Sequence, residues 1–480
     1  MNNHIDKKKQ PIAIGWTYVG IALLLLVLLI VWNRAYLYYI EQSHWEHDIF
    51  RPALQNKGGR ICYAPLYVRL ENTWTWWGVG ATIAAIILGL SVFWRQKKWE
   101  HSLFFHAFLI TIWASILATT EQPIRWASTT YNNFEVFFKG LIYPNISTLL
   151  QHYTSAMQHS LGDGSAHYPP GNLVLVYLLS GSDILLGLKL LMVLLLVPML
   201  YYWQKCLQIM AISPDIAQKA LLLLPTASSL FIFATLNFST ITVLLAIVQY
   251  YCFWKATQQT QPWAWAIAIG GITALYAFFS FTVAVSSLQL MIGAFLGIYL
   301  GCFSWQKIVY IGSIASTFFL LIYLSLYLIL GFDMWLCFRQ AIQNAHQLMG
   351  VNGGFDDIWR YILRSSGNIL AFFWSIGLLS SAMFLVGMYR IIVQERHISK
   401  NWQLMASSLG LTLLISAFGG LFFGETERVW VFFVPFVLLV VAHEWQLFQN
   451  RYGFISSFVL YVILLLNALL QELLFIHVLG

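Results

Sequence analysis

Long apolar runs alternate with short polar segments along the whole chain. Runs of about twenty apolar residues, the length that spans a bilayer as a helix, recur at 12–32, 77–94, 307–330 and 454–478. Because a helix satisfies its own backbone polar groups inside lipid, such runs predict spanning helices. The alternation over about ten residues that marks a membrane β-barrel does not occur. The pattern therefore predicts an all-α, polytopic transmembrane helical bundle of about 13 helices.

Composition strengthens this prediction and excludes other classes of protein. Hydrophobic residues make up 59% of the 480 and charged residues only 9%, whereas a soluble domain carries about 25% charged residues. The net charge of +7 is spread over helix ends rather than gathered in one stripe, so no nucleic-acid partner is expected. The five cysteines lie far apart without a CxxC spacing, which indicates neither a zinc ribbon nor a disulfide framework.

The basic residues between the apolar runs predict an orientation, because short loops rich in Lys and Arg stay in the cytoplasm. Residues 7–9 are all lysine and place the N-terminus inside. The run that follows is longer than a signal-peptide core and lacks a small-residue cleavage site, so we interpret it as a retained helix. Arg390, Arg396 and Lys400 mark another inner loop. The predicted outer segments are then 34–73, 120–170, 331–365 and 420–428.

This orientation constrains the middle of the chain. An even number of crossings must separate Pro170 from Gly331, yet an odd number of apolar blocks lies between them. One block is therefore split, re-entrant or counted in error, and Pro225 or the pair Gly270 and Gly271 would account for it. No soluble domain and no internal repeat is visible. The domains we expect are an N-terminal two-helix addition (1–100), a transmembrane core (101–446) and a C-terminal transmembrane helix (447–480).

The first large outer segment combines surface helices with a cluster of charges. Residues 133–142 and 148–157 are amphipathic, as is typical of helices lying flat on a membrane. Ionisable side chains beside a membrane are costly, so their clustering suggests a function. The charged residues of this cluster are Glu121, Arg125, Glu135 and Lys139. The motif His167-Tyr168-Pro169-Pro170-Gly171 ends the segment, just before an apolar helix.

The double proline of this motif predicts a rigid helix start, because proline lacks a backbone donor and suits the first helical turn. That rigidity would hold His167 and Tyr168 at a fixed depth near the bilayer surface. The histidines at 152, 159 and 167 are spaced by seven and eight residues. A metal site would also need a convergent carboxylate or cysteine, so we expect no metal there.

Two further polar groups fall on the predicted outer face. The run Gly424-Glu425-Thr426-Glu427-Arg428-Val429-Trp430 lies between two strongly apolar stretches. Its two carboxylates and its guanidinium suit a phosphate and a polar acceptor, because the fork of arginine matches phosphate oxygens. The segment 333–364, which ends with Arg364, is more polar than a simple connector requires.

Taken in order, these features resemble the GT-C membrane glycosyltransferases, a superfamily that includes protein O-mannosyltransferases and the lipid A aminoarabinose transferase. The resemblance covers residues 100–445 and depends on three short motifs: the His-Tyr-Pro-Pro-Gly helix start, the run Leu179-Ser180-Gly181-Ser182-Asp183 with Lys189 after it, and the Gly-Glu-Thr-Glu-Arg-Val-Trp run. The last looks like the GE-x-ER-x-W motif of bacterial GT-C-like proteins that also carry an HPPG helix start.

The resemblance implies a GT-C-like fold and an inverting transfer of a sugar from a polyprenyl-phosphate donor to a glycan, lipid or protein acceptor of the cell envelope. Such an enzyme lies in the bacterial plasma (inner) membrane, crosses it many times and works at the extracytoplasmic face; some members use a divalent ion. Its general base is usually an Asp early in the first outer loop. This sequence offers Glu135 and, second, Glu121 instead, with Glu46 and Asp48 after the first helix as a rival pair.

The implied substrate-binding residues are taken from all three polar groups: His167, Tyr168, Glu425, Glu427, Arg428, Arg125, Lys139 and Arg364. Each also has a plain structural interpretation. Glu121 and Arg125 have the spacing of a helix pair, Glu135 suits a solvated helix face, and Arg428 suits an interfacial anchor paired with Glu425. Two other functions stay open, a secondary transporter or lipid flippase and a non-catalytic GT-C-like scaffold. A transporter is expected to show inverted repeats with broken helices, and neither is visible in the sequence.

Overall fold

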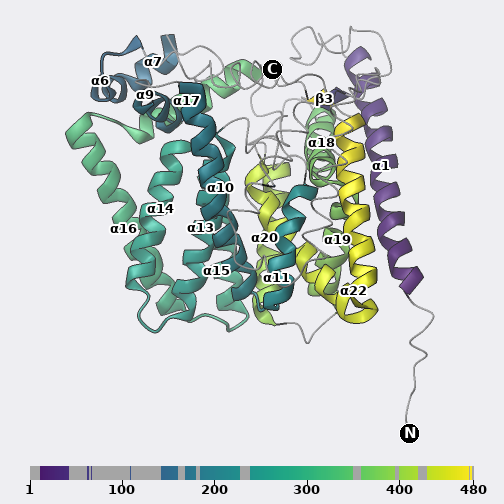
Figure 1. The fold of residues 1–480 in the computed structure, drawn as a ribbon. Coiled ribbons are helices and arrows are strands. Elements are labelled where there is room, and N and C mark those ends of the chain that lie inside the picture. The colour runs from purple at the N-terminus through teal and green to yellow at the C-terminus, as the bar shows by residue number, and fades with distance from the viewer. Residues whose placement is uncertain are drawn as a thin grey trace.

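The computed structural model describes residues 11–42, 62–63, 66–67, 109, 142–159, 168–179, 184–227, 238–349, 358–394, 399–419, 430–474 and 476–477. These residues form a bundle of helices whose axes run side by side (Figure 1). We call the end of the bundle nearest the N-terminus in Figure 1 the lower end and the opposite end the upper end. The all-α prediction is confirmed, and the apolar helices indicate a membrane protein.

The described elements follow one another in chain order, with the numbering of Figure 1. They are α1 (Pro11–Gln42), β1 (Cys62–Tyr63), β2 (Leu66–Tyr67), α6 (Ile146–Gln151), α7 (Tyr153–His159), α9 (Gly171–Leu178), α10 (Ile184–Ile209), α11 (Pro214–Ala220), the 3-10 helix η2 (Leu221–Thr226), α13 (Ser239–Gln258), α14 (Trp263–Phe279), α15 (Val283–Tyr299), α16 (Trp305–Leu330), α17 (Met334–Met349), α18 (Ile358–Ile376), α19 (Leu378–Tyr389), the π-helix η3 (Arg390–Gln394), α20 (Lys400–Phe418), the 3-10 helix η4 (Val431–Phe433), α22 (Val434–Leu474) and β3 (Ile476–His477).

Within these residues, four helical stretches are long and apolar enough to cross a membrane: Gly15–Ala35, Leu186–Ile209, Trp305–Leu330 and Val431–Ala468. They differ in what surrounds them. Few side chains of α16 are buried, as expected of a helix facing lipid, whereas the first part of α22, from Val434 to Trp445, is buried throughout. The three two-residue strands form a small antiparallel sheet in the order β1-β2-β3, with Leu66 opposite His477.

Helix α22 is a hairpin rather than one long span. Its 41 residues would extend over about 60 Å, roughly twice the hydrocarbon thickness of a bilayer. Gly453 interrupts it with φ 82° and ψ 178°. The rings of Trp445 and Tyr461 stack with centroids 6.1 Å apart, although 16 residues of straight helix would separate them by about 24 Å. The chain therefore reverses at Gly453 and crosses the bundle twice.

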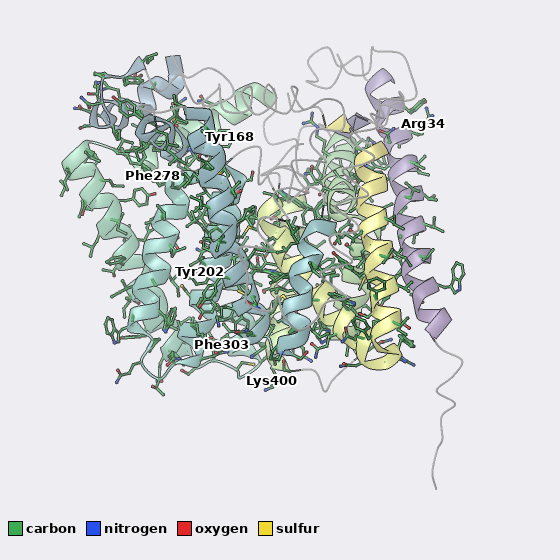
Figure 2. The ribbon with its side chains drawn as sticks, in the orientation of Figure 1. Arg34, Tyr168, Tyr202, Phe278, Phe303 and Lys400 are labelled. Atoms are coloured by element: carbon green, nitrogen blue, oxygen red, sulfur yellow. The ribbon has the colours of Figure 1, made fainter. Side chains whose placement is uncertain are left out.

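The segment between Pro170 and Gly331 begins and ends at the upper end, as the predicted orientation requires (Figures 1 and 2). Its irregular piece is the short α11 followed by η2, and Pro225 lies in η2. The pair Gly270 and Gly271, also suspected of splitting an apolar block, has a different role. A Cβ atom at Gly270 would lie 2.4 Å from the carbonyl oxygen of Ala315, so this glycine lets α14 pack closely on α16 instead of breaking a helix.

The sequence showed no broken helix, and this interpretation is wrong for α18 and α19. Helices α18 and α19 are separated by Gly377, which has φ 100°, and their axes differ by 111°. The sequence showed no such break, because Gly377 lies inside a continuous apolar run. A glycine with positive φ is the usual residue where a chain must leave helical geometry.

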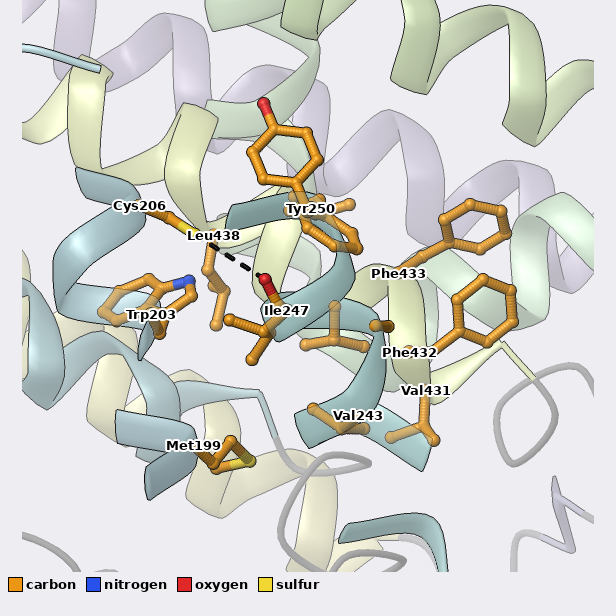
Figure 3. Packing of buried hydrophobic residues seen from close by; sticks show 14 of the residues in the cluster. Met199, Trp203, Cys206, Val243, Ile247, Tyr250, Val431, Phe432, Phe433 and Leu438 are labelled. Atoms are coloured by element: carbon orange, nitrogen blue, oxygen red, sulfur yellow. Dashed lines mark hydrogen bonds between the residues drawn. The ribbon is translucent and has the colours of Figure 1, made fainter. Parts of the chain in front are cut away.

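The buried core lies where α10, α13 and α22 meet. Figure 3 shows Met199, Trp203 and Cys206 of α10 facing residues of α13 and Leu438 of α22. The indole Nε1 of Trp203 donates a hydrogen bond to the carbonyl oxygen of Pro435 at 2.9 Å. This bond satisfies the one polar group of a large buried side chain. It also ties two helices that are distant in sequence.

Candidate functional site

The Tyr168–Gly171 segment at the upper end is held rigidly by its packing. The hydroxyl of Tyr153 donates a hydrogen bond of 2.8 Å to the carbonyl oxygen of Tyr168. Pro169 and Pro170 are buried, and a Cβ atom at Gly171 would lie 2.5 Å from the carbonyl oxygen of Phe278. A glycine is therefore required for this close approach. The predicted helix start after the double proline is confirmed, because α9 begins at Gly171, and Figure 2 shows Tyr168 at the upper end.

Tyr153 is a dependable donor in this contact. It is completely buried, and burial raises the pKa of its phenol well above the ordinary value. The hydroxyl therefore stays protonated at any physiological pH. Because Tyr153 belongs to α7 and Tyr168 precedes α9, the bond fixes the surface helix and the helix start relative to each other.

The predicted surface helix at 148–157 is present as α6 and α7, which meet at His152. Asn145 begins α6, because its Oδ1 accepts a hydrogen bond of 2.8 Å from the backbone nitrogen of Thr148. One face is buried and the other exposed: Leu149, Leu150, Tyr153, Ala156 and Met157 are buried. This amphipathic arrangement agrees with the sequence pattern. The other predicted surface stretch, 133–142, lies outside the described residues apart from Ile142.

Helix α17 brings a second predicted outer segment against α7. Gln158 Nε2 donates to Gln340 Oε1 at 2.7 Å, and Asn344 Nδ2 donates to the carbonyl oxygen of Met157 at 3.3 Å. Asp333 has a structural role, since its Oδ1 accepts from the backbone nitrogen of Leu336 at the start of the helix. Two of the three polar segments expected on the outer face therefore meet.

Arg364 lies on the inward face of α18, with only 4% of its surface exposed. Asn368, one helical turn later, is fully buried beside it on the same face. Phe372, a further turn along, packs its ring 5.5 Å from that of Trp430. Trp430 is the last residue of the Gly424–Trp430 run, so the end of this run lies against the helix that carries Arg364. A guanidinium buried among apolar helices is uncommon and suits an anion.

Most of the predicted site lies outside the described residues. This holds for both carboxylates proposed as bases, for the rival pair and for most of the binding residues: Glu121, Glu135, Glu46, Asp48, Arg125, Lys139, His167, Glu425, Glu427 and Arg428. Of the predicted site residues, Tyr168 and Arg364 are described. They belong to elements on different sides of the upper end (Figure 1). Within the described part of the chain, no three His, Cys, Asp or Glu side chains are placed to hold a metal ion.

The sequence interpretation missed a buried ion pair near the lower end. Arg390 Nη1 lies 3.0 Å from Glu444 Oε2, and the hydroxyl of Tyr18 donates to the same oxygen at 3.0 Å. Glu444 has no exposed surface. The pair joins η3 and α22, and Tyr18 adds α1. A carboxylate within the apolar run that follows Trp430 was the available signal, because an ionisable residue inside a membrane span is rarely without a partner.

Polar groups at the break between α18 and α19 form hydrogen bonds within the protein. The backbone nitrogen of Leu379 donates to Asn467 Oδ1 at 2.8 Å, and the hydroxyl of Ser381 donates to the carbonyl oxygen of Phe373 at 2.7 Å. Free backbone groups at helix ends are the usual ion-binding elements of broken transporter helices. Here these two are already bonded within the protein.

Comparison with known proteins does not identify a family: the chain matches no protein-family model and no curated protein.

Proposed function

We propose that this protein is an inverting membrane glycosyltransferase that moves a sugar from a polyprenyl-phosphate donor to a cell-envelope acceptor. The observation that carries the proposal is the rigid Tyr168–Gly171 segment at the upper end, packed on α7 and α14. His167 directly precedes this segment in the chain, and the proposal puts the donor phosphate beside it, at the membrane surface. The apolar bundle below offers lipid-facing helices beside which a polyprenyl tail can lie.

The chemistry assigns one carboxylate and several cations. Glu135, or else Glu121, accepts the proton of the acceptor hydroxyl while its oxygen attacks the anomeric carbon of the donor. The bond from that carbon to the phosphate oxygen breaks, and polyprenyl phosphate leaves with the bonding electron pair. Arg428 and Arg364 stabilise the charge that develops on the phosphate, and Arg125 and Lys139 add positive charge on the approach. Attack from the face opposite the phosphate inverts the anomeric centre.

A secondary transporter or lipid flippase is the second candidate, and the bent pair α18–α19 favours it. Discontinuous helices are common in transporters, and Arg364 and Asn368 are buried on the inward face of this pair. The bonds of Leu379 and Ser381 count against it, because they occupy two groups that a substrate would use. A scaffold that keeps the fold without catalysis is the third reading, and the same assay separates it from the first.

The test uses the full chain purified into lipid nanodiscs, with a set of radiolabelled polyprenyl-phosphate sugars and a cell-envelope lipid and glycan fraction as acceptor. We expect Glu135→Gln to lower transfer by about 100-fold or more, the size of a lost general base. Asp48→Asn tests the rival pair, and Asp333→Asn is a matched control, because it removes a carboxylate charge at a helix cap of the same end.

Three results would count against the proposal. Transfer that is unchanged in both Glu135→Gln and Glu121→Gln would remove the assigned base, and loss of transfer in Asp48→Asn alone would move the site to the first outer loop. Absence of transfer by the unmodified protein with every donor, together with movement of labelled lipid across reconstituted vesicles, would favour the flippase.

A further inference from the structure

Two helices carry the same three side chains at the same spacing near the lower end. Tyr201, Lys205 and Gln208 follow one another on one face of α10. Tyr251, Lys255 and Gln258 do so on one face of α13, with identical intervals of four and three residues. Those intervals place each triplet on a single helix face. Both helices run toward the lower end (Figure 1). Along each helix the tyrosine therefore lies farthest from the lower end, the glutamine lies nearest to it, and the lysine lies between them.

The two triplets face each other across a cavity of about 460 Å³, and Ile209 completes its lining. The contact between Tyr202 and Tyr251, with ring centroids 5.3 Å apart, holds the two helices at matching depth. Among the described residues that line the cavity there is no carboxylate. The cavity therefore contains two positive charges without a negative charge to balance them.

Each lysine is held in position by its own triplet. Lys205 Nζ lies 5.3 Å from the centre of the Tyr201 ring, and Lys255 Nζ lies 5.8 Å from the centre of the Tyr251 ring. Both distances are within the range of a cation–π contact. Lys205 Nζ also donates to Gln208 Oε1 at 3.2 Å, which leaves the amide nitrogen of Gln208 free to donate to a ligand. Both lysines are half-buried, so their partial loss of hydration favours an anion.

We infer that this cavity binds the phosphate of an anionic lipid headgroup at the membrane surface predicted to be cytoplasmic. The shared chemistry is a phosphate oxygen between two ammonium groups, with hydroxyl and amide donors around it. Basic pockets between transmembrane helices on this side of a membrane typically bind lipid headgroups. The lower end also carries Lys307 and Lys400, whose ammonium groups donate to the carbonyl oxygens of Thr257 and Leu300, and which lie outside the cavity. The inference does not depend on the transferase proposal, because the cavity lies at the opposite end from the Tyr168–Gly171 segment.

The experiment measures binding of phosphatidylglycerol to the full-length protein, delipidated in neutral detergent, by native mass spectrometry. Phosphatidylcholine is the zwitterionic comparison. We expect the double change Lys205→Gln with Lys255→Gln to weaken phosphatidylglycerol binding by roughly tenfold or more, since each lysine near an anionic lipid contributes substantially. The double change Lys307→Gln with Lys400→Gln removes the same charge from the same end outside the cavity, and it should leave binding unchanged.

Two further measurements separate the possible explanations of a weaker binding. The pair Lys205→Arg with Lys255→Arg keeps both charges and should retain binding, which separates a lost site from a misfolded variant. Inorganic phosphate at millimolar concentration should compete only if the natural ligand is a soluble phosphate; such competition would keep the site and change its ligand. Equal phosphatidylglycerol binding by the glutamine pair and its control, or equal binding of phosphatidylcholine and phosphatidylglycerol to the unmodified protein, would overturn the inference.

Discussion

Arg390 reaches Glu444 with its Nη1 atom 3.0 Å from Oε2, and that carboxylate is completely buried. The contact joins η3 to α22, and Tyr18 of α1 donates to the same oxygen. Gly387 allows the close packing that brings these elements together, since a Cβ atom there would lie 2.8 Å from Glu444 Cγ. The pair is therefore built into a tight junction of three helical elements.

Removing one member of this pair should be costly. We expect Arg390→Gln to lower the free energy of unfolding by about 3–5 kcal/mol, because it leaves a buried carboxylate without its cation. Thermal unfolding in detergent, followed by tryptophan fluorescence, measures the change. The double change Arg390→Gln with Glu444→Gln should recover a large part of the loss. A single variant as stable as the unmodified protein would show that the pair contributes nothing to stability.

Gly171 should not tolerate a methyl group. Gly171→Ala places a Cβ atom against the carbonyl oxygen of Phe278 and the ring of Phe279, so we expect a loss of about 1–3 kcal/mol by overpacking. Gly312→Ala is the matched control, because no atom lies within 4 Å of its Cβ position, and it should be neutral or slightly stabilising. Equal stability of the two variants would contradict the close packing at the start of α9.

Asn467 should stabilise the break between α18 and α19. Asn467→Ala leaves the backbone nitrogen of Leu379 without its acceptor, and an unsatisfied buried donor costs about 1–3 kcal/mol. Leu466→Ala, one residue away and 42% exposed on the helix surface, should cost less. Hydrogen exchange of the Leu379 amide is the more specific measurement. Unchanged protection of that amide in Asn467→Ala would rule out the bond.

The thiols should differ strongly in reactivity. Burial, helped by the charge of Asp333, raises the pKa of Cys337 to about 12, so little thiolate exists at neutral pH. In a Cys62→Ser background, maleimide at pH 7.5 should label the partly exposed Cys302 and leave Cys337 unlabelled until the protein unfolds. Peptide mass spectrometry locates the label. Rapid labelling of Cys337 in the folded protein would contradict its burial.

The same thiol predicts a pH dependence. An unfolded cysteine has a pKa near 8.5, below the folded value of about 12. The contribution of Cys337 to stability is therefore complete below about pH 8.5 and is lost as the pH rises toward 12. A Cys337→Ala variant should show a weaker decline of unfolding temperature over this interval.

Accessibility in intact cells tests the orientation. Cys302 is adjacent to Phe303, which Figure 2 shows near the lower end, predicted to be cytoplasmic. Ser147 of α6 is exposed, and α6 lies at the upper end (Figure 1). A membrane-impermeant maleimide should label Ser147→Cys in intact cells and Cys302 only after permeabilisation. The reverse pattern would invert the protein and place the proposed transferase site in the cytoplasm.

Local features of the fold were predictable because each depends on neighbouring residues. The apolar runs predicted α1 and α16, and the double proline predicted the start of α9. The alternation of apolar and polar residues at 148–157 predicted the surface helices. In each case a physical rule links residues within a few turns of one another.

Features that depend on distant partners were not predictable in this way. Nothing near Glu444 in the sequence indicates that Tyr18 would bond to it, and the reversal at Gly453 depends on the packing of Trp445 on Tyr461. Gly377 is one of 32 glycines in the chain, and nothing in the neighbouring residues indicates that it takes a positive φ, as Gly301, Gly331 and Gly453 also do. The matching triplets on α10 and α13 were readable in the sequence, but their meeting across a cavity was not.

The bond between Tyr18 and Glu444 has a consequence for biogenesis. Its two residues are 426 positions apart, so a ribosome adding about 5–20 residues per second needs roughly 20–90 s to make the second after the first. During that interval α1 is already in the bilayer while its acceptor has not been synthesised. The last hairpin can therefore enter the membrane with Glu444 paired to Arg390, which is synthesised before it, and α1 must still be near the nascent chain for Tyr18 to complete the contact.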